Sequence, residues 1–460
     1  MFSLSFWSIK KGNKIGIIDQ KYGSFTYKQL QQLIDQMKQE ITSKNKKLGI
    51  VLCDNHVYSL AGYLAGLQVR DAVMLLDAQM NEGLFKQVLA EYQPDWIMTF
   101  KELNSLTNYQ QTEIEQEYIL YHKISESKGE LHPDLALLLS TSGTTGSSKF
   151  VRLSYQNLQS NAESIVEYLE LNEKERPITT LPMQYSYGLS VINSHLHAEG
   201  TLLLTSESIL SKGFWEFFKQ HEATSFSGVP YTYQMLQRLR FERMELPSLR
   251  YFTQAGGRLS DKLIGYFQEI AEANHYLFYV MYGQTEATAR ISYVSPQELS
   301  GKVGSIGKVI PGGRLHLDAE TNELIYEGDN VMLGYAHSRA DLAKGDELQG
   351  ILRTGDVAEQ DEDGFFYIKG RMKRFIKLFG LRISLDDVEK SIERQLGLAV
   401  ACTGDDEKMV VALEDTKSEQ VSHFIRDTFK LHPRSYKVIE LEQMPRLSNG
   451  KVDYSKLKEL

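Results

Sequence analysis

LGIVLC, residues 48–53, is a short, uninterrupted apolar run, and runs of this kind decide the fold. Similar runs recur along the chain: AVMLLD (72–77), LALLL (135–139), TLLLT (201–205) and YLFYVMYG (276–283). Their length fits strands that are buried on both faces. Between the runs, stretches such as Tyr27–Ile41 repeat apolar residues at helical spacing. Alternating strand and helix signals predict an α/β fold in which helices cover largely buried sheets.

The pattern changes near residue 370, where a turn at Asp363-Gly364 leads into the basic stretch GRMKR (370–374). Beyond it, Ser384 and Asp387 have the spacing of a helix N-cap, and helix- and strand-like stretches follow to residue 441. A chain of 460 residues is also too long for one core. We therefore predict a large N-terminal domain of layered α/β subdomains, residues 1–371, and a small α+β C-terminal domain, residues 372–460, whose mobility is implied only by the family resemblance given below.

Composition excludes several classes of protein. The chain has 51 Lys and Arg against 60 Asp and Glu, and its net charge of −9 is dispersed, which argues against binding of nucleic acid. The apolar runs are too short to span a membrane. Cys53 and Cys402 lie far apart without the spacing of a metal site, which indicates buried thiols in a reducing, cytoplasmic compartment. The oligomeric state is left open, with a homodimer as one option.

The stretch TSGTTGSSK, residues 141–149, combines hydroxyls, glycines and a lysine. It is not a Walker loop, because Gly143 and Gly146 are too close together and a strand-like run follows Lys149. Such a loop can still bind phosphate oxygens through backbone N–H groups, hydroxyls and the ammonium group. A polar turn between two strands is the alternative.

Two further segments carry polar side chains suited to a nucleotide. YGQTEA (282–287) follows an apolar run, so Tyr282 and Glu286 are expected in a loop at a strand's end, where ligands bind in open α/β sheets. A tyrosine ring there can stack on a base, and a carboxylate can bind Mg²⁺ beside phosphates. LRTGDVA (352–358) is expected to put Asp356 in a turn, where it could accept hydrogen bonds from ribose hydroxyls. A core-edge tyrosine, a surface glutamate and a turn aspartate are the alternatives.

Taken together, these segments resemble the adenylate-forming superfamily: acyl-CoA synthetases, firefly luciferase and the adenylation domains that load carrier proteins. The resemblance covers nearly the whole chain, in order. Its motifs are TSGTTGSSK, LPMQYSYGL (181–189), FTQAGGRLS (252–260), YGQTEATARISY (282–293), GSIGKVIPGG (304–313), ELIYEGDNVMLGY (323–335), RTGD (353–356), GRMKRFIKLFG (370–380) and PRLSNGKVD (445–453).

The resemblance implies that ATP activates a carboxylic acid as an acyl-adenylate, with release of pyrophosphate. It also implies transfer of the acyl group to CoA, or to the phosphopantetheine of a carrier protein as the alternative acceptor. Catalysis is then assigned to Lys451, Thr285 and Glu286, with Glu286 also binding Mg²⁺. The expected ATP-binding residues are Thr141, Ser142, Gly143, Thr144, Thr145, Gly146 and Lys149 at the β and γ phosphates, and Gly256, Gly257, Tyr282, Gly283, Asp356 and Arg371 around the nucleoside.

For the second step the resemblance implies a hinge at Lys373, about which the small domain turns, and a thiol-facing surface at Lys377 and Gly380. The acyl pocket is expected to be partly apolar, with hydroxyls suited to a fatty, aryl or hydroxylated acid. Its expected residues are Tyr185, Tyr187, Val229, Tyr231 and Ala255. Segment 184–190 lacks the aspartate with which relatives that activate amino acids hold an α-ammonium group.

The chain departs from the family pattern in three ways. Tyr185 stands where many acyl-CoA synthetases have histidine, and Arg374 stands where many relatives have an acidic residue. The small domain is short, which reduces the surface expected to grip CoA and keeps a carrier protein as a rival acceptor. A non-catalytic nucleotide-binding protein on the same fold is the third alternative. It would be expected to lack Lys451, Glu286 or Asp356, and all three are present.

Overall fold

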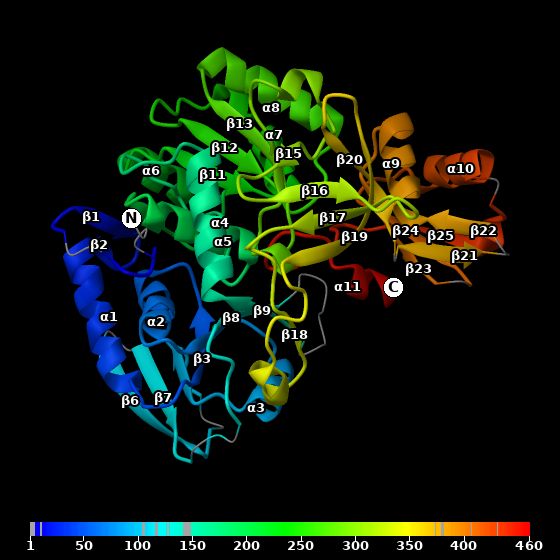
Figure 1. The fold of residues 1–460 in the computed structure, drawn as a ribbon. Coiled ribbons are helices and arrows are strands. Elements are labelled where there is room, and N and C mark those ends of the chain that lie inside the picture. The colour runs from blue at the N-terminus through cyan, green and yellow to red at the C-terminus, as the bar shows by residue number, and fades with distance from the viewer. Residues whose placement is uncertain are drawn as a thin grey trace.

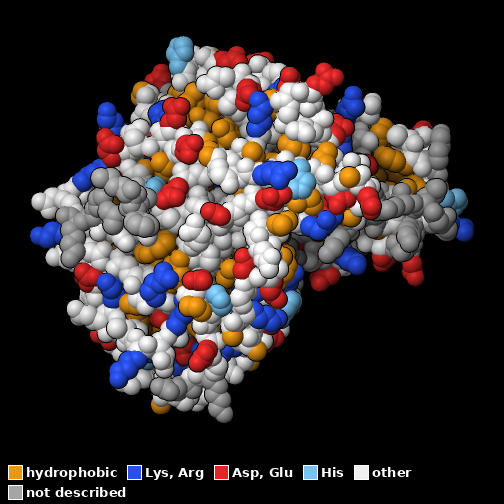
Figure 2. Space-filling model, in the orientation of Figure 1, with side chains coloured by type: hydrophobic (Ala, Val, Ile, Leu, Met, Phe, Trp, Pro, Cys, Tyr) orange, Lys and Arg blue, Asp and Glu red, His pale blue; other side chains and the backbone are white. Residues whose placement is uncertain are grey.

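A computed structural model describes residues 5–9, 12–103, 106–115, 118–125, 127, 129–140, 149–372, 374–378, 381–405, 407–429 and 431–460. Figure 1 shows a large body of sheets and helices with the C-terminal elements at one side. On the face drawn in Figure 2, basic and acidic side chains are interspersed over the surface. Within the described ranges, no helix is long and apolar enough to cross a membrane.

The largest sheet has eight strands and is built around the opening run. β3 is buried at every residue and pairs in parallel with both β4 and β5. In spatial order the strands are β18 (Gly334–Ala336), β9 (Phe150–Ser154), β8 (Leu135–Ser140), β4 (Ala72–Asp77), β3 (Leu48–Cys53), β5 (Trp96–Thr99), β7 (Tyr118–Lys123) and β6 (Tyr109–Glu115). Apolar clusters on its two faces include residues of α1 (Tyr27–Ile41) and α2 (Val57–Gln68) on one side and of α3 (Glu82–Tyr92) on the other.

A second sheet has five strands, and its parallel part ends at the candidate site. Its strands are β11 (Ser225–Gly228), β12 (Tyr251–Gln254), β13 (Leu277–Tyr282), β14 (Ser292–Val294) and β15 (Lys308–Val309). Its outer core includes residues of α6 (Lys212–Gln220), α7 (Pro230–Arg238) and α8 (Asp261–Asn274). Two central helices, α4 (Tyr155–Tyr168) and α5 (Ser186–His197), share clusters with both large sheets and so lie between them (Figure 1).

Two smaller sheets complete the body. One consists of β10 (Leu202–Leu204), β1 (Ile15–Asp19) and β2 (Gly23–Thr26), and the other of β16 (Arg314–Leu317), β17 (Glu323–Glu327), β19 (Ile351–Gln360) and β20 (Phe366–Arg371). The predicted turn at Asp363-Gly364 joins β19 to β20, with Gly364 at φ +85°. Short 3₁₀ turns also occur, among them η2 (Thr285–Ala287) beside the site.

The C-terminal elements form apolar clusters of their own, drawn from residues 376–457. Their strands are β21 (Phe375–Leu378) with β22 (Leu381–Ser384), and β23 (Val400–Gly404), β24 (Met409–Leu413) and β25 (Tyr436–Glu440); the helices are α9 (Leu385–Leu396), α10 (Ser418–Phe429) and α11 (Tyr454–Lys458). The predicted N-cap is confirmed, because Ser384 accepts a hydrogen bond from the Asp387 N–H at the start of α9.

The predicted α/β fold is confirmed, and the five apolar runs of the sequence all become strands. Phe150–Ser154 form the strand β9, as the alternating pattern after Lys149 predicts, and β9 pairs antiparallel with β8. The expectation for Asp356 was wrong: it lies within the ten-residue strand β19. Gly355 has φ +74°, and the β19–β20 register shifts between Val357 and Ala358, so the strand continues through an irregularity where the sequence indicates a turn.

Candidate active site

The site begins where β13 ends. Tyr282 is the last residue of β13, and Thr285 and Glu286 lie in the 3₁₀ turn η2 directly after it. Gly283 makes this turn possible, because a Cβ atom at that position would lie 1.8 Å from the carbonyl oxygen of Ala289. Glu286 is therefore in a connection at the strand's end, as predicted, whereas Tyr282 still belongs to the strand.

Three residues expected at the nucleoside form one hydrogen-bonded group. Tyr282 Oη donates to Asp356 Oδ2, and Arg371 Nε donates to Asp356 Oδ1 at 3.1 Å. Burial raises the pKa of Asp356, and the charge of Arg371 opposes that rise. Burial also raises the pKa of Tyr282, so its hydroxyl stays a donor. The segments around residues 282, 356 and 371, distant in sequence, thus meet through a single carboxylate.

A second group links the end of the predicted phosphate loop to the predicted metal ligand. Lys149 Nζ lies 3.4 Å from the ring centroid of Tyr335, and Tyr335 Oη donates to Glu286 Oε1 at 2.9 Å. The ring reaches this place because β18 pairs antiparallel with β9, opposite Val151. The other phosphate-loop residues, Thr141, Ser142, Gly143, Thr144, Thr145 and Gly146, lie outside the described residues.

The carboxylate of Glu286 fits a magnesium ion that is shared with a nucleotide. The part of the chain that the structure describes has no cluster of three or more His, Cys, Asp or Glu side chains able to hold a metal. Mg²⁺ commonly keeps several waters and is bound through one or two carboxylates together with substrate phosphates. A single glutamate beside Lys149 and Tyr335 suits that mode of binding.

Thr285 is buried, and its hydroxyl lies 3.0 Å from the hydroxyl of Ser186. Ser186 is the first residue of α5, and the preceding Tyr185 gives the helix no side-chain cap. The N-terminus of a helix carries a partial positive charge and free backbone N–H groups, which favour an anion nearby. The structure therefore adds Ser186 and the start of α5 to the predicted Thr285.

Lys451 comes from the other end of the chain to the middle of this group. Its Nζ lies 5.2 Å from the ring centroid of Tyr185, and its Cε lies 3.4 Å from where a Cβ on Gly256 would be. Burial lowers the pKa of Lys451 to about 8; the charge of Arg371 lowers it further, and that of Glu286 opposes the change. The residues around the lysine are held against the body, since the Arg446 guanidinium lies 4.1 Å from the ring centroid of Tyr231.

Gly256 allows this close approach. It has φ +81°, and a Cβ there would lie 2.5 Å from Tyr185 Oη, so a larger residue would displace the tyrosine. At Gly257 a Cβ would lie 3.2 Å from Pro230 Cγ. The AGG segment thus lets Tyr185 and Lys451 pack directly against backbone.

The residues predicted for the acyl pocket lie together in one apolar cluster that contains several tyrosines. Its buried or half-buried members include Tyr185, Tyr187, Val229, Tyr231 and Ala255. The rings of Tyr185 and Tyr187 are 6.2 Å apart, and Tyr187 Oη donates to the carbonyl oxygen of Thr253 at 2.9 Å. Burial raises the pKa of both tyrosines, which stay neutral.

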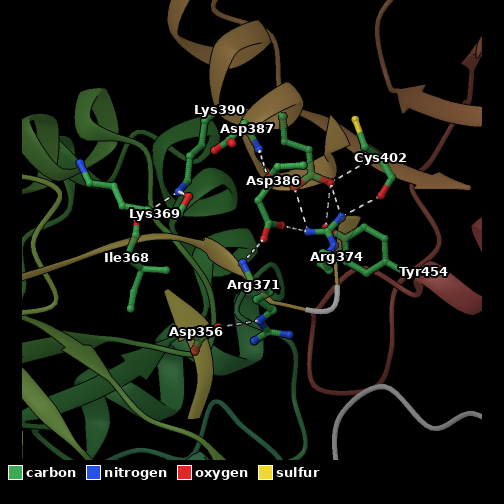
Figure 3. Close-up of polar contacts among 12 residues, drawn as sticks. Asp356, Ile368, Lys369, Arg371, Arg374, Asp386, Asp387, Lys390, Cys402 and Tyr454 are labelled. Atoms are coloured by element: carbon green, nitrogen blue, oxygen red, sulfur yellow. Dashed lines mark hydrogen bonds and ion pairs between the residues drawn. The ribbon is translucent and has the colours of Figure 1, made fainter. Parts of the chain in front are cut away.

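Arg374, the departure at the connection between the two parts, belongs to the C-terminal elements. Its guanidinium donates to Asp386, to Glu389 and, at 2.7 Å, to the carbonyl oxygen of Cys402, and it lies 4.4 Å from the ring centroid of Tyr454 (Figure 3). An acidic residue at position 374 would meet two carboxylates there, so the arginine is matched to this chain's own α9. Lys373, Gly380 and the side chain of Lys377 lie outside the described residues.

The motifs do not single out four residues of this region: Ser186, Tyr335, Asp386 and Arg290, whose guanidinium lies over the ring of Tyr187. Arg290 and Tyr335 lie inside motifs of the resemblance. For Arg290 the sequence offers one signal, a single charged residue in the otherwise uncharged stretch ATARIS; for Tyr335 it offers none. Ser186 lies between Tyr185 and Tyr187, and the sequence favours these two larger residues as pocket residues. The sequence predicts a helix start at Ser384 and Asp387, but it does not show which carboxylate of that helix faces the preceding connection, so Asp386 is not singled out.

Comparison with known proteins gives a consistent picture. Residues 7–336 match the family model described as AMP-binding enzyme. The 2-succinylbenzoate–CoA ligase of Bacillus velezensis is 27% identical over 73% of this chain and 72% of its own. The D-alanine–D-alanyl carrier protein ligase of Staphylococcus epidermidis is 24% identical over 95% of this chain and 94% of its own.

Solved structures share the fold over almost the full length. The O-succinylbenzoate coenzyme A synthetase of Bacillus subtilis in complex with AMP has a TM-score of 0.78, with 20% identity over 97% of this chain and 96% of its own. A structure of that synthetase in complex with ATP and magnesium ion has a TM-score of 0.74 at 19% identity, over the same shares.

Proposed function

Since the match to its family model spans residues 7–336, the chain belongs to the AMP-binding enzyme family, and we propose that it is an ATP-dependent acid–thiol ligase. The enzyme activates a carboxylic acid as an acyl-adenylate and then transfers the acyl group to a thiol. The single observation that carries this proposal is the position of Lys451, half-buried beside Tyr185 and Gly256 and close enough to Glu286 to feel its charge.

In the first step an oxygen of the substrate carboxylate attacks the α-phosphorus of ATP. The new bond joins that oxygen to phosphorus, the bond between the α-phosphorus and the bridging oxygen breaks, and pyrophosphate leaves. Two anions must meet and charge builds on the phosphoryl oxygens, so fixed cations and donors have to offset it. Lys451 supplies the ammonium group, and Thr285 with the N-terminus of α5 supplies neutral donors.

The remaining residues orient the nucleotide. We assign Tyr282 to the adenine ring, Asp356 to the ribose hydroxyls and Arg371 to the ribose or phosphate, because these three already form one hydrogen-bonded group. Lys149, with the loop before it, is assigned to the β and γ phosphates. Glu286 would hold Mg²⁺, which neutralises charge on the phosphate oxygens when it is bound.

In the second step the thiol loses its proton to solvent and attacks the acyl carbon as a thiolate, a carbon–sulfur bond forms, and AMP leaves with the electron pair of the broken anhydride bond. The thiol needs a path to the site that Lys451 now fills. We propose that residues 1–371 and 372–460 are two domains and that the smaller one turns about Lys373 between the steps. The separate apolar clusters of residues 376–457 support this division.

CoA and a carrier-protein phosphopantetheine are both candidate acceptors. Relatives named as CoA ligases favour the first, and the carrier protein ligase that matches over 95% of this chain favours the second. For the acid we propose an aryl or hydroxylated body rather than a plain fatty chain, because the pocket cluster is rich in tyrosines. A cytoplasmic location is also proposed, supported by two buried free thiols.

The test is a panel assay of pyrophosphate release with Mg²⁺–ATP across aryl, fatty and amino acids, each with and without CoA. We expect at least one acid to support pyrophosphate release and AMP formation. Release of inorganic phosphate instead, or nucleotide binding without turnover for every acid, would contradict the proposal and favour a non-catalytic nucleotide-binding protein.

A further inference from the structure

Arg290 is a buried cation, and two of its nitrogens have no hydrogen-bond partner within the described residues. Two arginines have side chains that are almost fully buried, Arg152 at 0% exposure and Arg290 at 1%. Arg152 is paired with Glu347 and donates to four backbone carbonyl oxygens. Arg290 forms no ion pair within the described ranges, and its Nε and Nη1 have no hydrogen-bond partner there.

The surroundings of Arg290 make this costly. Its guanidinium lies over the ring of Tyr187, with Cζ 4.1 Å from the ring centroid, and it also interacts with Tyr168 and Tyr185. A cation over an aromatic ring recovers part of the lost hydration energy, but not the hydrogen bonds of a fully desolvated guanidinium. Buried charges in native proteins are paired or serve a ligand.

The place of Arg290 in the site indicates which ligand. Lys451 stands over the near ring, Tyr185, and Arg290 over the next ring of the pocket, Tyr187. Lys451 and Arg290 therefore each contact one of two neighbouring tyrosine rings, whose centroids are 6.2 Å apart. Asn161 and Asn330 donate to the carbonyl oxygen of Arg290, which fixes its backbone and leaves the guanidinium for another partner.

We propose that the substrate is a diacid: one carboxylate is activated at Lys451, and a second carboxylate at the far end of the acyl body pairs with Arg290. This inference rests on the proposed function and names the substrate class of the same site. Nε and Nη1 of Arg290 lack partners in the described protein, and either can give a charge-assisted hydrogen bond, for which a carboxylate oxygen is a matching acceptor. The aromatic cluster around it excludes water, so a monoacid would leave the cation unpaired and bind poorly.

The first experiment compares matched acids on the full chain: hexanoate against adipate, and benzoate against terephthalate, by pyrophosphate release with Mg²⁺–ATP. We expect the diacid of at least one pair to be preferred by about 10²-fold or more in kcat/KM. Equal use of both members, or preference for the monoacid in both pairs, would overturn the inference while leaving the proposed function intact.

Two variants test the assignment to Arg290. In Arg290→Met the diacid preference should fall by about 10²-fold, and Arg290→Lys should recover part of it. The ligand-free Arg290→Met protein should also have a raised Tm, since an unpaired buried charge is replaced by an apolar side chain. Arg446→Met is the matched control, because it removes another arginine that lies over a pocket tyrosine; its diacid preference should not change. An equal fall in both variants would contradict the inference.

A binding measurement separates this inference from the proposed function. Tm is recorded with AMP and each diacid, in wild type and in Arg290→Met. Diacids that raise the Tm of wild type only would support pairing at Arg290 even if no acid supports pyrophosphate release, in which case the ligase proposal alone fails. If no diacid raises the Tm of wild type more than its monoacid does, the pairing is refuted.

Discussion

The carboxylate of Asp386 in α9 accepts a hydrogen bond from the backbone N–H of Arg371 at 2.9 Å, and this contact joins the C-terminal elements to the end of β20 (Figure 3). The second oxygen of Asp386 accepts from the guanidinium of Arg374. Arg371 in turn donates through its side chain to Asp356 on β19. One carboxylate thus connects Arg371, two residues before the proposed hinge at Lys373, to Arg374, directly after it.

Asp386→Asn should weaken the arrangement in which Lys451 lies in the site. The amide keeps only one acceptor oxygen for two donors, so we expect the first half-reaction to slow about tenfold, the effect of losing one hydrogen bond to a charged group. Thioester formation from a supplied acyl-adenylate should be unchanged or faster, because the Arg371 contact must break before the small domain can turn.

The measurement compares carboxylate-dependent pyrophosphate exchange with single-turnover thioester formation. Asp387→Asn is the matched control, since the neighbouring side chain makes no hydrogen bond to Arg371 or Arg374 in the described part of the chain. Equal losses in both half-reactions would show that Asp386 supports folding rather than the balance between two arrangements.

Arg374→Met tests whether the arginine at this connection stabilises the small C-terminal part. Arg374, Asp386 and Glu389 are mostly buried, with side-chain exposures of 21%, 13% and 19%. Removing the cation leaves two carboxylates without their partner, so the free energy of unfolding should fall by about 1–3 kcal/mol, less than for a fully buried pair. Urea unfolding measures this, with exposed Arg394→Met as control; an unchanged midpoint would refute the assignment.

The sequence predicted the central strands well, because β3 and its neighbours are buried on both faces and therefore appear as continuous apolar runs of strand length. It also named residues from distant segments that the structure brings close together: Tyr282 bonds Asp356, and Lys451 lies beside Tyr185. It failed at Asp356 because a glycine with positive φ can bend a strand without ending it. The sequence could not predict the role proposed for Arg290, because neither periodicity nor motifs show that a charged side chain is buried without a hydrogen-bond partner.

Tyr335→Phe tests the link between Lys149 and Glu286. The substitution keeps the ring under the Lys149 ammonium group and removes the hydroxyl that donates to Glu286 at 2.9 Å. Glu286 should then be less well oriented for Mg²⁺, and the Mg²⁺ concentration for half-maximal pyrophosphate release should rise about five- to tenfold. A Mg²⁺ titration at fixed ATP checks this. Tyr276→Phe, remote from the site, is the control, and an identical Mg²⁺ dependence in Tyr335→Phe would count against the link.

The pH dependence of the first half-reaction should report Lys451. Its pKa is lowered from 10.5 to about 8, chiefly by burial and then by the charge of Arg371, while Glu286 opposes the shift. The ammonium form is the one that can offset charge on the α-phosphate, and it is lost as pH rises. kcat/KM, which reflects the free enzyme, should therefore be constant below pH 8 and fall above it.

Bound ATP brings negative charge next to Lys451 and should raise its pKa, so the same fall in kcat should begin at a higher pH than in kcat/KM. Lys451→Arg keeps a cation that does not titrate in this range, and its kcat/KM should lack the alkaline fall even if the rate is reduced. Lys451→Ala should lose about 10²–10³-fold in rate at all pH values while still binding ATP. If the alkaline fall near pH 8 persists in Lys451→Arg, the fall belongs to a group other than Lys451. Tyr185, beside the lysine, is not that group, because burial raises its pKa far above this range.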